Sequence, residues 1–264
     1  MAEDQEPSLA APSGQTEIAR LLGIMARLRD PDRGCEWDLA QDFSSIAPYT
    51  IEEAYEVADA IERGAMDELR EELGDLLLQV VFHARMAEER GLFAFDDVAR
   101  AISDKMEARH PHIFRDAGGT MTEGRWEELK AAERQQKGAS SAMDGVARAL
   151  PALLRAEKLQ KRAARDGFDW GDTEGPTAKV HEEIGELAEA PQENRLEEAG
   201  DLLFAAVNLV RAYGVPAEEA LRAANDKFER RYRGMEEAAS GTFATLDLDA
   251  QEALWQQVKA AETF

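Results

Sequence analysis

The sequence predicts an all-α protein in which one helical unit occurs twice. Ala, Leu, Glu and Arg dominate the chain from Ile18 onward, and apolar residues recur at the spacing of an amphipathic helix. No segment shows the sustained alternation of β-branched residues that is typical of strands. The two halves of the chain also carry the same short motifs in the same order, which predicts a tandem duplication.

The composition excludes several classes of protein. The 264 residues include 54 acidic and 31 basic ones, and a formal net charge of −23 disfavours binding to nucleic acid or to an anionic membrane surface. There is no run of about 18 apolar residues, so no membrane span is expected. The first residues lack the apolar segment of a secretory signal, and the single cysteine, Cys35, excludes an internal disulfide framework. We therefore expect a cytoplasmic protein.

Four segments follow one another along the chain. Residues 1–17 are acidic and contain Pro and Ser without an apolar period, which predicts a disordered tail. Residues 18–135 carry the first set of helical patterns. The polar segment 136–147 is rich in Gly and Ser and is predicted to be a linker. Residues 148–264 carry the second set, so two helical domains of similar length are expected.

Five short motifs pair the two halves, and all four tryptophans fall on paired positions. Five motifs in one order are not expected from composition alone, so we interpret the chain as a duplicated helical unit. In chain order the pairs are Gly34–Asp38 with Gly167–Trp170, Glu52–Glu56 with Glu182–Glu186, Glu71–Leu77 with Glu197–Leu203, Asp104–Arg109 with Asp226–Arg231, and Trp126–Lys130 with Trp255–Lys259.

The second and third motifs place carboxylates where a cation is needed. Residues three and four apart share one face of a helix, so the E-E-x-x-E motif of each half forms an acidic face. In a sequence this acidic, one such face alone is typical of solvated surface. However, Asp75 and Asp201 each begin a strongly apolar run, where a carboxylate is costly unless a cation or hydrogen-bond donors compensate it. Mg²⁺ takes oxygen ligands and bridges carboxylates to phosphates, so we predict a Mg²⁺ site, with Mn²⁺ as a substitute.

The fourth and fifth motifs supply groups suited to a nucleotide. Basic residues four apart on a helix can neutralise phosphate oxygens, and they can equally form ion pairs with neighbouring glutamates. A tryptophan can stack on a base, although core packing is its commoner role. The sequence has no P-loop and no GxGxxG turn, so a nucleotide would be bound through metal ions held by helices. The residues concerned are Lys105, Arg109, Trp126 and Lys130 in the first half and Lys227, Arg231, Trp255 and Lys259 in the second.

Taken together, these motifs resemble the MazG family of nucleoside triphosphate pyrophosphohydrolases, in its long form with two tandem MazG domains. The resemblance rests on E-E-x-x-E followed by E-x-G-D in each half. It also rests on the paired segments Gly34–Asp38 and Gly167–Trp170, each with a tryptophan, and on the D-K-[MF]-E-x-R and W-x-x-x-K segments of each half. It implies an all-α fold in which helix pairs from two chains form a four-helix bundle, and therefore a homodimer. It also implies Mg²⁺-dependent hydrolysis of an NTP or dNTP to the monophosphate and pyrophosphate, with the metal–nucleotide complex as the ligand.

The resemblance implies that the second half is catalytic, although the first half retains every motif. The halves differ in one connector, because 15 residues separate Glu56 from Glu72 but 11 separate Glu186 from Glu198, with Pro191 among them. By resemblance, the Mg²⁺ ligands are Glu182, Glu183, Glu186, Glu198 and Asp201, and the substrate contacts are Lys179, Lys227, Arg231, Trp255 and Lys259. The first-half equivalents are Glu52, Glu53, Glu56, Glu72, Asp75, Lys105, Arg109, Trp126 and Lys130.

Two other functions stay open at this point. One is a helical dimer that binds nucleotide or a partner protein without turnover, with the carboxylates holding a structural cation. The other is a related all-α pyrophosphatase restricted to dUTP or phosphoribosyl-ATP. Metal-dependent release of pyrophosphate separates an enzyme from a binding module, and a substrate panel separates the two kinds of enzyme.

Overall fold

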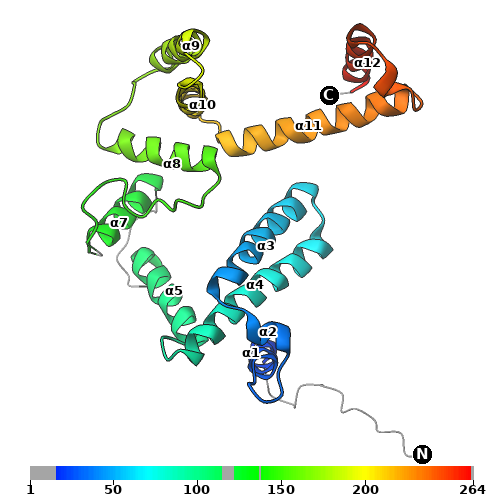
Figure 1. Cartoon of the computed structure of the whole chain (residues 1–264). Coiled ribbons are helices and arrows are strands. Elements are labelled where there is room, and N and C mark those ends of the chain that lie inside the picture. Colours follow the sequence, from blue (N-terminus) through cyan, green and yellow to red (C-terminus); the bar gives the residue numbers. More distant parts are fainter. Residues whose placement is uncertain (1–15, 115–121, 137, 263–264) are drawn as a thin grey trace, which may run out of the picture. The chain divides into compact units, whose positions relative to one another are not determined.

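Every regular element that the structure describes is a helix, which confirms the predicted all-α class (Figure 1). The computed structural model describes residues 16–114, 122–136 and 138–262. Of the tail predicted at 1–17, only Thr16 and Glu17 lie within these ranges, and the Thr16 hydroxyl caps the first helix by accepting from an amide of its first turn. The described helices all lack the combination of length and apolar character that crossing a bilayer demands.

The chain divides into two compact units, Met1–Trp126 and Glu127–Phe264. This division falls before the segment 136–147 that was predicted to be a linker. Within the second unit, the Arg162 guanidinium donates a hydrogen bond of 2.7 Å to the carbonyl oxygen of Ala142 and attaches part of that segment to the helix that follows. The exact domain limits therefore stay a prediction.

The first unit is built around a long antiparallel helix pair. α3 (Phe43–Arg63) and α4 (Met66–Glu89) pack against each other, and Gly64 ends α3 in the left-handed conformation, at φ 67°. α1 (Glu17–Leu28) packs on α4 and contributes to the apolar core. That core consists of Met25, Ile46, Val81, Phe82 and Met86. The other helices of this unit are α2 (Glu36–Ala40), α5 (Phe95–Arg109) and α6 (Pro111–Phe114).

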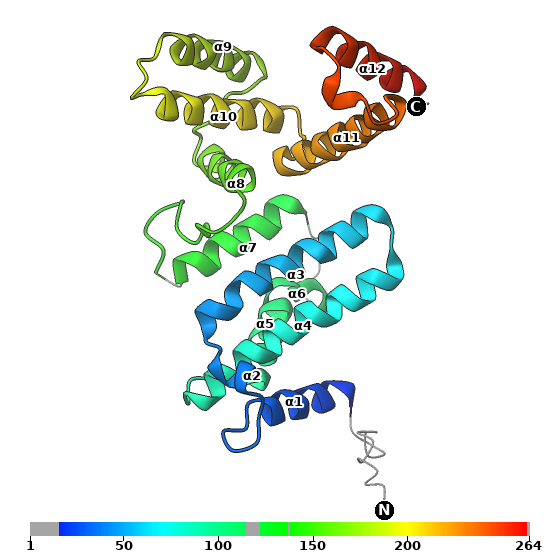
Figure 2. The same cartoon turned by 45° about the vertical axis from the view of Figure 1, so that its right-hand side comes forward.

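The second unit contains a similar but shorter antiparallel pair (Figure 2). This pair consists of α9 (Glu174–Glu189) and α10 (Arg195–Ala212), and α8 (Ala152–Arg165) packs on α10. α7 (Glu123–Gln136) precedes these helices and spans the boundary between the units.

A second helix pair follows in the same unit. α11 (Ala217–Ala238) packs on α12 (Leu248–Ala261), and the short helix η1 (Phe243–Thr245) joins them. Met235 and Phe243 are buried, and the Phe243 ring meets the Tyr232 ring of α11 edge-on, with the ring centres 5.1 Å apart. This packing gives the α11–α12 pair an apolar contact of its own.

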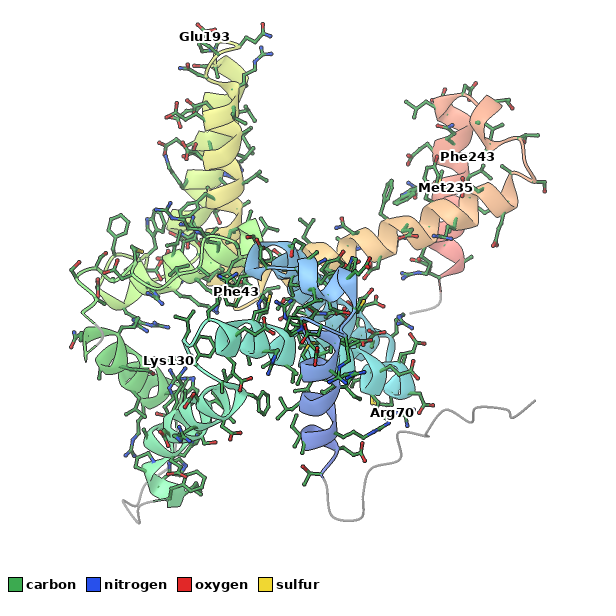
Figure 3. The ribbon with its side chains drawn as sticks, turned by 60° about the horizontal axis from the view of Figure 1, so that its bottom comes forward. Phe43, Arg70, Lys130, Glu193, Met235 and Phe243 are labelled. Atoms are coloured by element: carbon green, nitrogen blue, oxygen red, sulfur yellow. The ribbon has the colours of Figure 1, made fainter. Side chains whose placement is uncertain are left out.

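The two acidic motifs lie at different distances from the tips of their helix pairs. α3 continues from Glu56 to Arg63, about two turns, whereas α9 ends at Glu189, within one turn of Glu186. Figure 3 shows Glu193 at the end of the α9–α10 pair. The shorter connector of the second half therefore shortens the arms of its helix pair, and the second acidic motif lies near the tip.

Candidate functional site

Three carboxylates converge where α9 faces α10. Glu183 and Glu186 extend from α9 and Glu198 from α10, and their ligand oxygens all lie within 4.8 Å of one another. Glu183 is only 3% exposed, and its Oε2 has no hydrogen-bond partner among the described residues. Desolvation, together with the charge of Glu183, raises the pKa of Glu186 above its usual value. A buried carboxylate oxygen without a partner, inside such a cluster, indicates a place for a cation.

Lys179 compensates part of this negative charge. Its Nζ lies 2.6 Å from Glu183 Oε1 and 2.9 Å from Glu182 Oε1, and these hydrogen bonds raise the pKa of the ammonium group. The lysine precedes Glu183 by one helical turn, so the geometry of α9 itself brings the two side chains together. A single ammonium group does not neutralise a cluster of several carboxylates, and negative charge remains for a further cation.

The other two predicted ligands lie outside the group of three. Glu182 is exposed and bonded to Lys179. Asp201 is exposed on α10, but it lines the same cavity as Glu183. The structure thus carries all five predicted ligands on α9 and α10 and brings three of them close enough to share one ion.

A cavity of about 550 Å³, a size typical of ligand pockets, adjoins the cluster. It is bounded by α8, α9 and α10, so its walls all belong to the second unit. Lys179, Glu183 and Asp201 form the charged part of the wall, and the buried amides of Gln160 and Asn208 form another part. The aromatic lining residues are Phe168, Trp170 and Phe204. A ligand with one anionic end and one flat, partly apolar end suits these walls.

The remaining predicted substrate contacts lie on α11 and α12 (Figure 1). Lys227, Arg231, Trp255 and Lys259 are all absent from the lining of the cavity. Arg231 is buried, its guanidinium lies 5.2 Å from the centre of the Trp255 ring, and it forms an ion pair of 2.7 Å with Glu262. The hydrogen bond from Arg231 lowers the pKa of Glu262. Within one chain, these four residues are therefore not brought to the predicted metal ligands.

The first helix pair carries an acidic cluster of the same composition. Ligand oxygens of Glu53 and Glu56 on α3 and of Glu72 on α4 lie within 4.8 Å of one another. Desolvation and the charge of Asp75 raise the pKa of Glu53, and desolvation with the charge of Glu56 raises that of Glu72. Glu52 is exposed and outside the group. Among the described residues, each unit thus contains one potential cation site.

The residue one turn before the acidic motif differs between the two clusters. Tyr49 occupies the position in α3 that Lys179 occupies in α9. Its ring meets the Trp37 ring edge-on, with the ring centres 6.4 Å apart. The first cluster therefore has an aromatic neighbour where the second has a cation.

The basic and aromatic residues of the first half lie on α5 and α7. The Arg109 guanidinium lies 5.1 Å from the centre of the Trp126 ring, the same arginine–tryptophan pairing that occurs between α11 and α12. Lys105 is on α5 with Arg109, and Lys130 is on α7 with Trp126. The paired motifs therefore produce the same local contact in both halves.

Two residues of the cavity, Gln160 and Asn208, were not singled out from the sequence. They belong to none of the paired motifs, and single amides in a helix carry no distinctive signal. The register of the E-x-G-D motifs places Asn208 opposite Phe82, and the equivalent helix ends place Gln160 opposite Met25, both apolar core residues. The contrast with Phe82 could have identified Asn208 from the sequence, whereas the match of Gln160 with Met25 requires the structure.

The donor set of the second cluster fits a hard divalent cation. Every candidate ligand atom is a carboxylate oxygen, and such oxygens suit Mg²⁺ or Mn²⁺. The Oε2 of Glu183 has no hydrogen-bond partner among the described residues. With the adjoining cavity, this arrangement can bind an anionic ligand through a bridging cation.

Comparison with known proteins identifies relatives over most of the chain. A family model described as the MazG nucleotide pyrophosphohydrolase domain matches residues 41–114 and 173–235, and each segment contains one of the acidic clusters. A nucleoside triphosphate pyrophosphohydrolase of Escherichia coli K12 is 54% identical over 259 residues, which cover 93% of this chain and 98% of that protein.

Two further relatives differ in how much of their own length is matched. The Thermotoga maritima protein named nucleoside triphosphate pyrophosphohydrolase/pyrophosphatase MazG is 44% identical over 246 residues, or 92% of this chain and 95% of that protein. The uncharacterized protein YabN of Bacillus subtilis is 43% identical over 257 residues, which cover 93% of this chain but 52% of that protein.

Proposed function

The chain belongs to the MazG nucleotide pyrophosphohydrolase family, and we propose that the acidic cluster on α9 and α10 is its catalytic site. The membership confirms the family and the enzyme class expected from the motifs. The protein is a nucleoside triphosphate pyrophosphohydrolase, which converts an NTP to the monophosphate and pyrophosphate. Glu183 carries the assignment of the site, because this buried residue belongs both to the cluster and to the wall of a ligand-sized cavity, and one of its oxygens has no partner among the described residues.

We propose Mg²⁺ as the divalent cation that the family requires, with Mn²⁺ as a substitute. Glu183, Glu186 and Glu198 would hold it, with Asp201 and Glu182 completing the acidic shell. When bound, such an ion neutralises the triphosphate and lowers the pKa of water at the site. The preference for Mg²⁺ is supported by the all-carboxylate donor set and by its usual role between carboxylates and phosphates.

Lys179 is placed to contact either the carboxylates or the substrate. It is bonded to Glu183 in the described structure, and it also lines the cavity. Released from Glu183 when a cation binds, its ammonium group would neutralise a phosphate oxygen. One of the cluster glutamates would accept a proton from the water that attacks the α-phosphorus, and pyrophosphate would leave. The net charge of −23 repels a free NTP, so the metal–nucleotide complex is the expected substrate.

We also propose that the protein is a homodimer in which helix pairs of two chains form a four-helix bundle. The α9–α10 pair leaves Leu196 88% exposed and Leu203 60% exposed, and the α3–α4 pair exposes Ile51 and Leu73. A unit of roughly 100 residues buries a limited share of its apolar surface, and a second copy would cover these side chains. Light scattering at micromolar concentration should give the mass of two chains, and the mass of one chain would contradict the proposal.

In this dimer, we assign the basic residues of α11 and α12 to the site of the partner protomer. Lys227, Arg231, Trp255 and Lys259 do not line the cavity of their own chain, so a second copy is the way in which they reach a bound triphosphate. A mixture of Glu183→Ala and Lys227→Ala chains tests this. Each variant alone should be nearly inactive, and their heterodimers should regain one intact site, giving roughly a quarter of wild-type activity. No recovery on mixing would place Lys227 with its own cluster.

The first unit has a supporting role in this proposal. Its acidic cluster can hold a cation, but Tyr49 replaces the lysine, and the buried Met25 and Phe82 occupy the core positions that correspond to the amides of the second cavity. We propose that it serves as a dimer scaffold or as a second cation site. A cytoplasmic location is part of the proposal and is consistent with the free thiol of Cys35.

The release of pyrophosphate across all NTPs and dNTPs tests the proposed function directly. Release should require Mg²⁺ or Mn²⁺, should stop when a chelator is added and should return when the metal is restored. Activity confined to dUTP or phosphoribosyl-ATP would identify a more restricted pyrophosphatase. Nucleotide-dependent thermal stabilisation without any pyrophosphate release would contradict the assignment of the site as catalytic.

A further inference from the structure

The cavity of the second unit contains a buried amide whose hydrogen-bonding capacity is only half used. Gln160 on α8 is 6% exposed, and its Nε2 donates a hydrogen bond of 2.8 Å to the carbonyl oxygen of Phe204. A carbonyl oxygen accepts and never donates, so this bond fixes which end of the amide is which. The Oε1 of Gln160 is buried and has no partner among the described residues. Gln160 therefore combines a place on the cavity wall with an acceptor that no described residue uses.

A second amide on the same wall is oriented in the opposite sense. Asn208 on α10 is 9% exposed, and its Oδ1 accepts hydrogen bonds from the guanidinium of Arg211, one of them at 3.1 Å. Arg211 is held in turn by Asp169, at 2.6 Å and 3.0 Å. Because the arginine occupies the oxygen, the Nδ2 hydrogens of Asn208 are its remaining donors, and they form no hydrogen bond with a described residue. Two residues of the cavity wall thus carry an unused acceptor and an unused donor, respectively.

The first unit has apolar side chains at the corresponding positions. The E-x-G-D motifs pair Asp75 with Asp201, and the same register pairs Phe82 with Asn208. At the C-terminal ends of α1 and α8, the Cys35 N–H donates to the Leu28 carbonyl and the Phe168 N–H donates to the Ala163 carbonyl. Cys35 and Phe168 occupy equivalent places in the paired motifs, so the position three residues before each acceptor is equivalent too. These positions are Met25 and Gln160.

The contrast between the two units indicates that Gln160 and Asn208 serve binding and not packing. Met25 and Phe82 are both members of the buried apolar core of the first unit. The fold therefore accepts two apolar side chains at these places, while burial of an amide without its full set of partners is costly. The second unit has Gln160 and Asn208 on the wall of a cavity instead. The cost is offset when a ligand supplies the missing donor and acceptor.

We propose that Gln160 and Asn208 recognise the hydrogen-bonding edge of the nucleobase. Gln160 Oε1 accepts from an N–H of the base, and Asn208 Nδ2 donates to the acceptor beside it. This inference rests on the proposed function, because Lys179, Glu183 and Asp201 on the same cavity wall would hold the phosphate end. Each common base carries an N–H next to an acceptor on its pairing edge. The two amides therefore favour an intact nucleobase over a triphosphate whose base lacks one of these groups, and do not by themselves select one base.

The test compares ATP with purine riboside triphosphate, which lacks the exocyclic amino group. The wild-type enzyme should use ATP with a kcat/KM about tenfold higher, the equivalent of one hydrogen bond. In Gln160→Met, which introduces the residue of the first unit, this preference should disappear through a higher KM for ATP with kcat little changed. Gln79→Met is the matched control, because Gln79 is also buried with an unpartnered Oε1 but does not line the cavity. It should keep the wild-type preference.

The outcomes distinguish a failure of this inference from a failure of the proposed function. Equal use of the two triphosphates by the wild-type enzyme, or an unchanged preference in folded Gln160→Met, would overturn the inference while leaving the catalytic site in place. Failure of the wild-type enzyme to hydrolyse any NTP would instead contradict the proposed function. If Gln160→Met fails to fold, a second variant, Asn208→Leu, tests the inference independently. This variant should abolish the discrimination between ATP and an analogue in which the ring nitrogen acceptor is replaced by C–H.

Discussion

The α3–α4 pair and the α9–α10 pair hold acidic clusters of the same composition in different surroundings. Each cluster has two glutamates from one helix and one from the next, and their ligand oxygens lie within 4.8 Å of one another. Beside the second cluster lie Lys179 and a cavity of about 550 Å³ with two amides in its wall. Beside the first lies Tyr49, and the positions equivalent to the amides belong to a packed apolar core. The ligand-sized cavity beside the second cluster makes that cluster the candidate active site.

The glutamates of the two clusters also differ in burial. Glu183 is almost completely buried, whereas Glu53, at the equivalent position, is half-buried. Burial excludes water and strengthens the interaction of a carboxylate with a bound cation. The second cluster also lies closer to the tip of its helix pair, because α9 ends within one turn of Glu186. These differences favour the second unit as the place of turnover, and each can be tested.

The largest expected difference concerns activity. The double variant Glu182→Ala/Glu183→Ala should lose pyrophosphate release by about a hundredfold or more, because it removes the buried oxygen that holds the cation. The matching variant Glu52→Ala/Glu53→Ala should keep most of the activity. Initial rates of pyrophosphate release at saturating Mg²⁺, with far-UV circular dichroism to check the helical content, measure both.

Two results would change this assignment. Equal losses in the two double variants would mean two working sites or tight coupling between the units. Loss in the first-unit variant alone would move catalysis to α3 and α4. The two variants remove the same number of charges from equivalent positions, so a general electrostatic effect cannot account for a difference between them.

A smaller difference is expected in stability. Phe82→Ala should lower the free energy of unfolding by about 3–5 kcal/mol, because it leaves a hole in a packed apolar core. Asn208→Ala removes a residue of an existing cavity and should cost about 1 kcal/mol, the value of its hydrogen bonds. Urea unfolding of the metal-free protein, fitted with a separate transition for each unit, measures both changes. A cost as large for Asn208→Ala as for Phe82→Ala would make the amide a core residue.

The features of the two acidic clusters that depend on local periodicity could be predicted from the sequence. Glu183 and Glu186 share a face of α9 because of their spacing alone, and the order of the motifs brought Glu198 to the same place once two helices paired. The all-α class followed from the same periodicity. Lys179 was expected only as a substrate contact, by resemblance, and its place one turn before Glu183 explains why it also bonds to the cluster.

The parts that depend on packing between distant segments could not be predicted from motifs. The cavity requires α8 to pack on α10, and only then do Gln160 and Asn208 face the same space. The direction of α11 is likewise fixed by contacts and not by spacing. Ion pairing of Arg231 and packing of Trp255 were both open from the sequence, but the spacing did not predict that Arg231 lies against Trp255 and pairs with Glu262, apart from the carboxylates.

The smallest expected difference concerns the affinity of each cluster for a cation. Lys179 is bonded to both Glu182 and Glu183, so its ammonium group competes with a cation for the same oxygens. Lys179→Met should therefore strengthen Mn²⁺ binding to the second cluster by about fivefold, a magnitude typical of a partly exposed ion pair. The converse variant, Tyr49→Lys, should weaken binding to the first cluster. Titration of Mn²⁺ in the absence of nucleotide, followed by electron paramagnetic resonance, separates free from bound ion.

The background for each titration determines which cluster is measured. Lys179→Met is best examined in the Glu52→Ala/Glu53→Ala background, and Tyr49→Lys in the Glu182→Ala/Glu183→Ala background, so that one cluster remains in each case. Hydrolysis by Lys179→Met should fall although its cation binds more tightly, because the phosphate loses its lysine. Weaker Mn²⁺ binding in Lys179→Met would mean that the lysine positions Glu183 for the cation instead of competing with it. In that case Tyr49→Lys should strengthen Mn²⁺ binding to the first cluster.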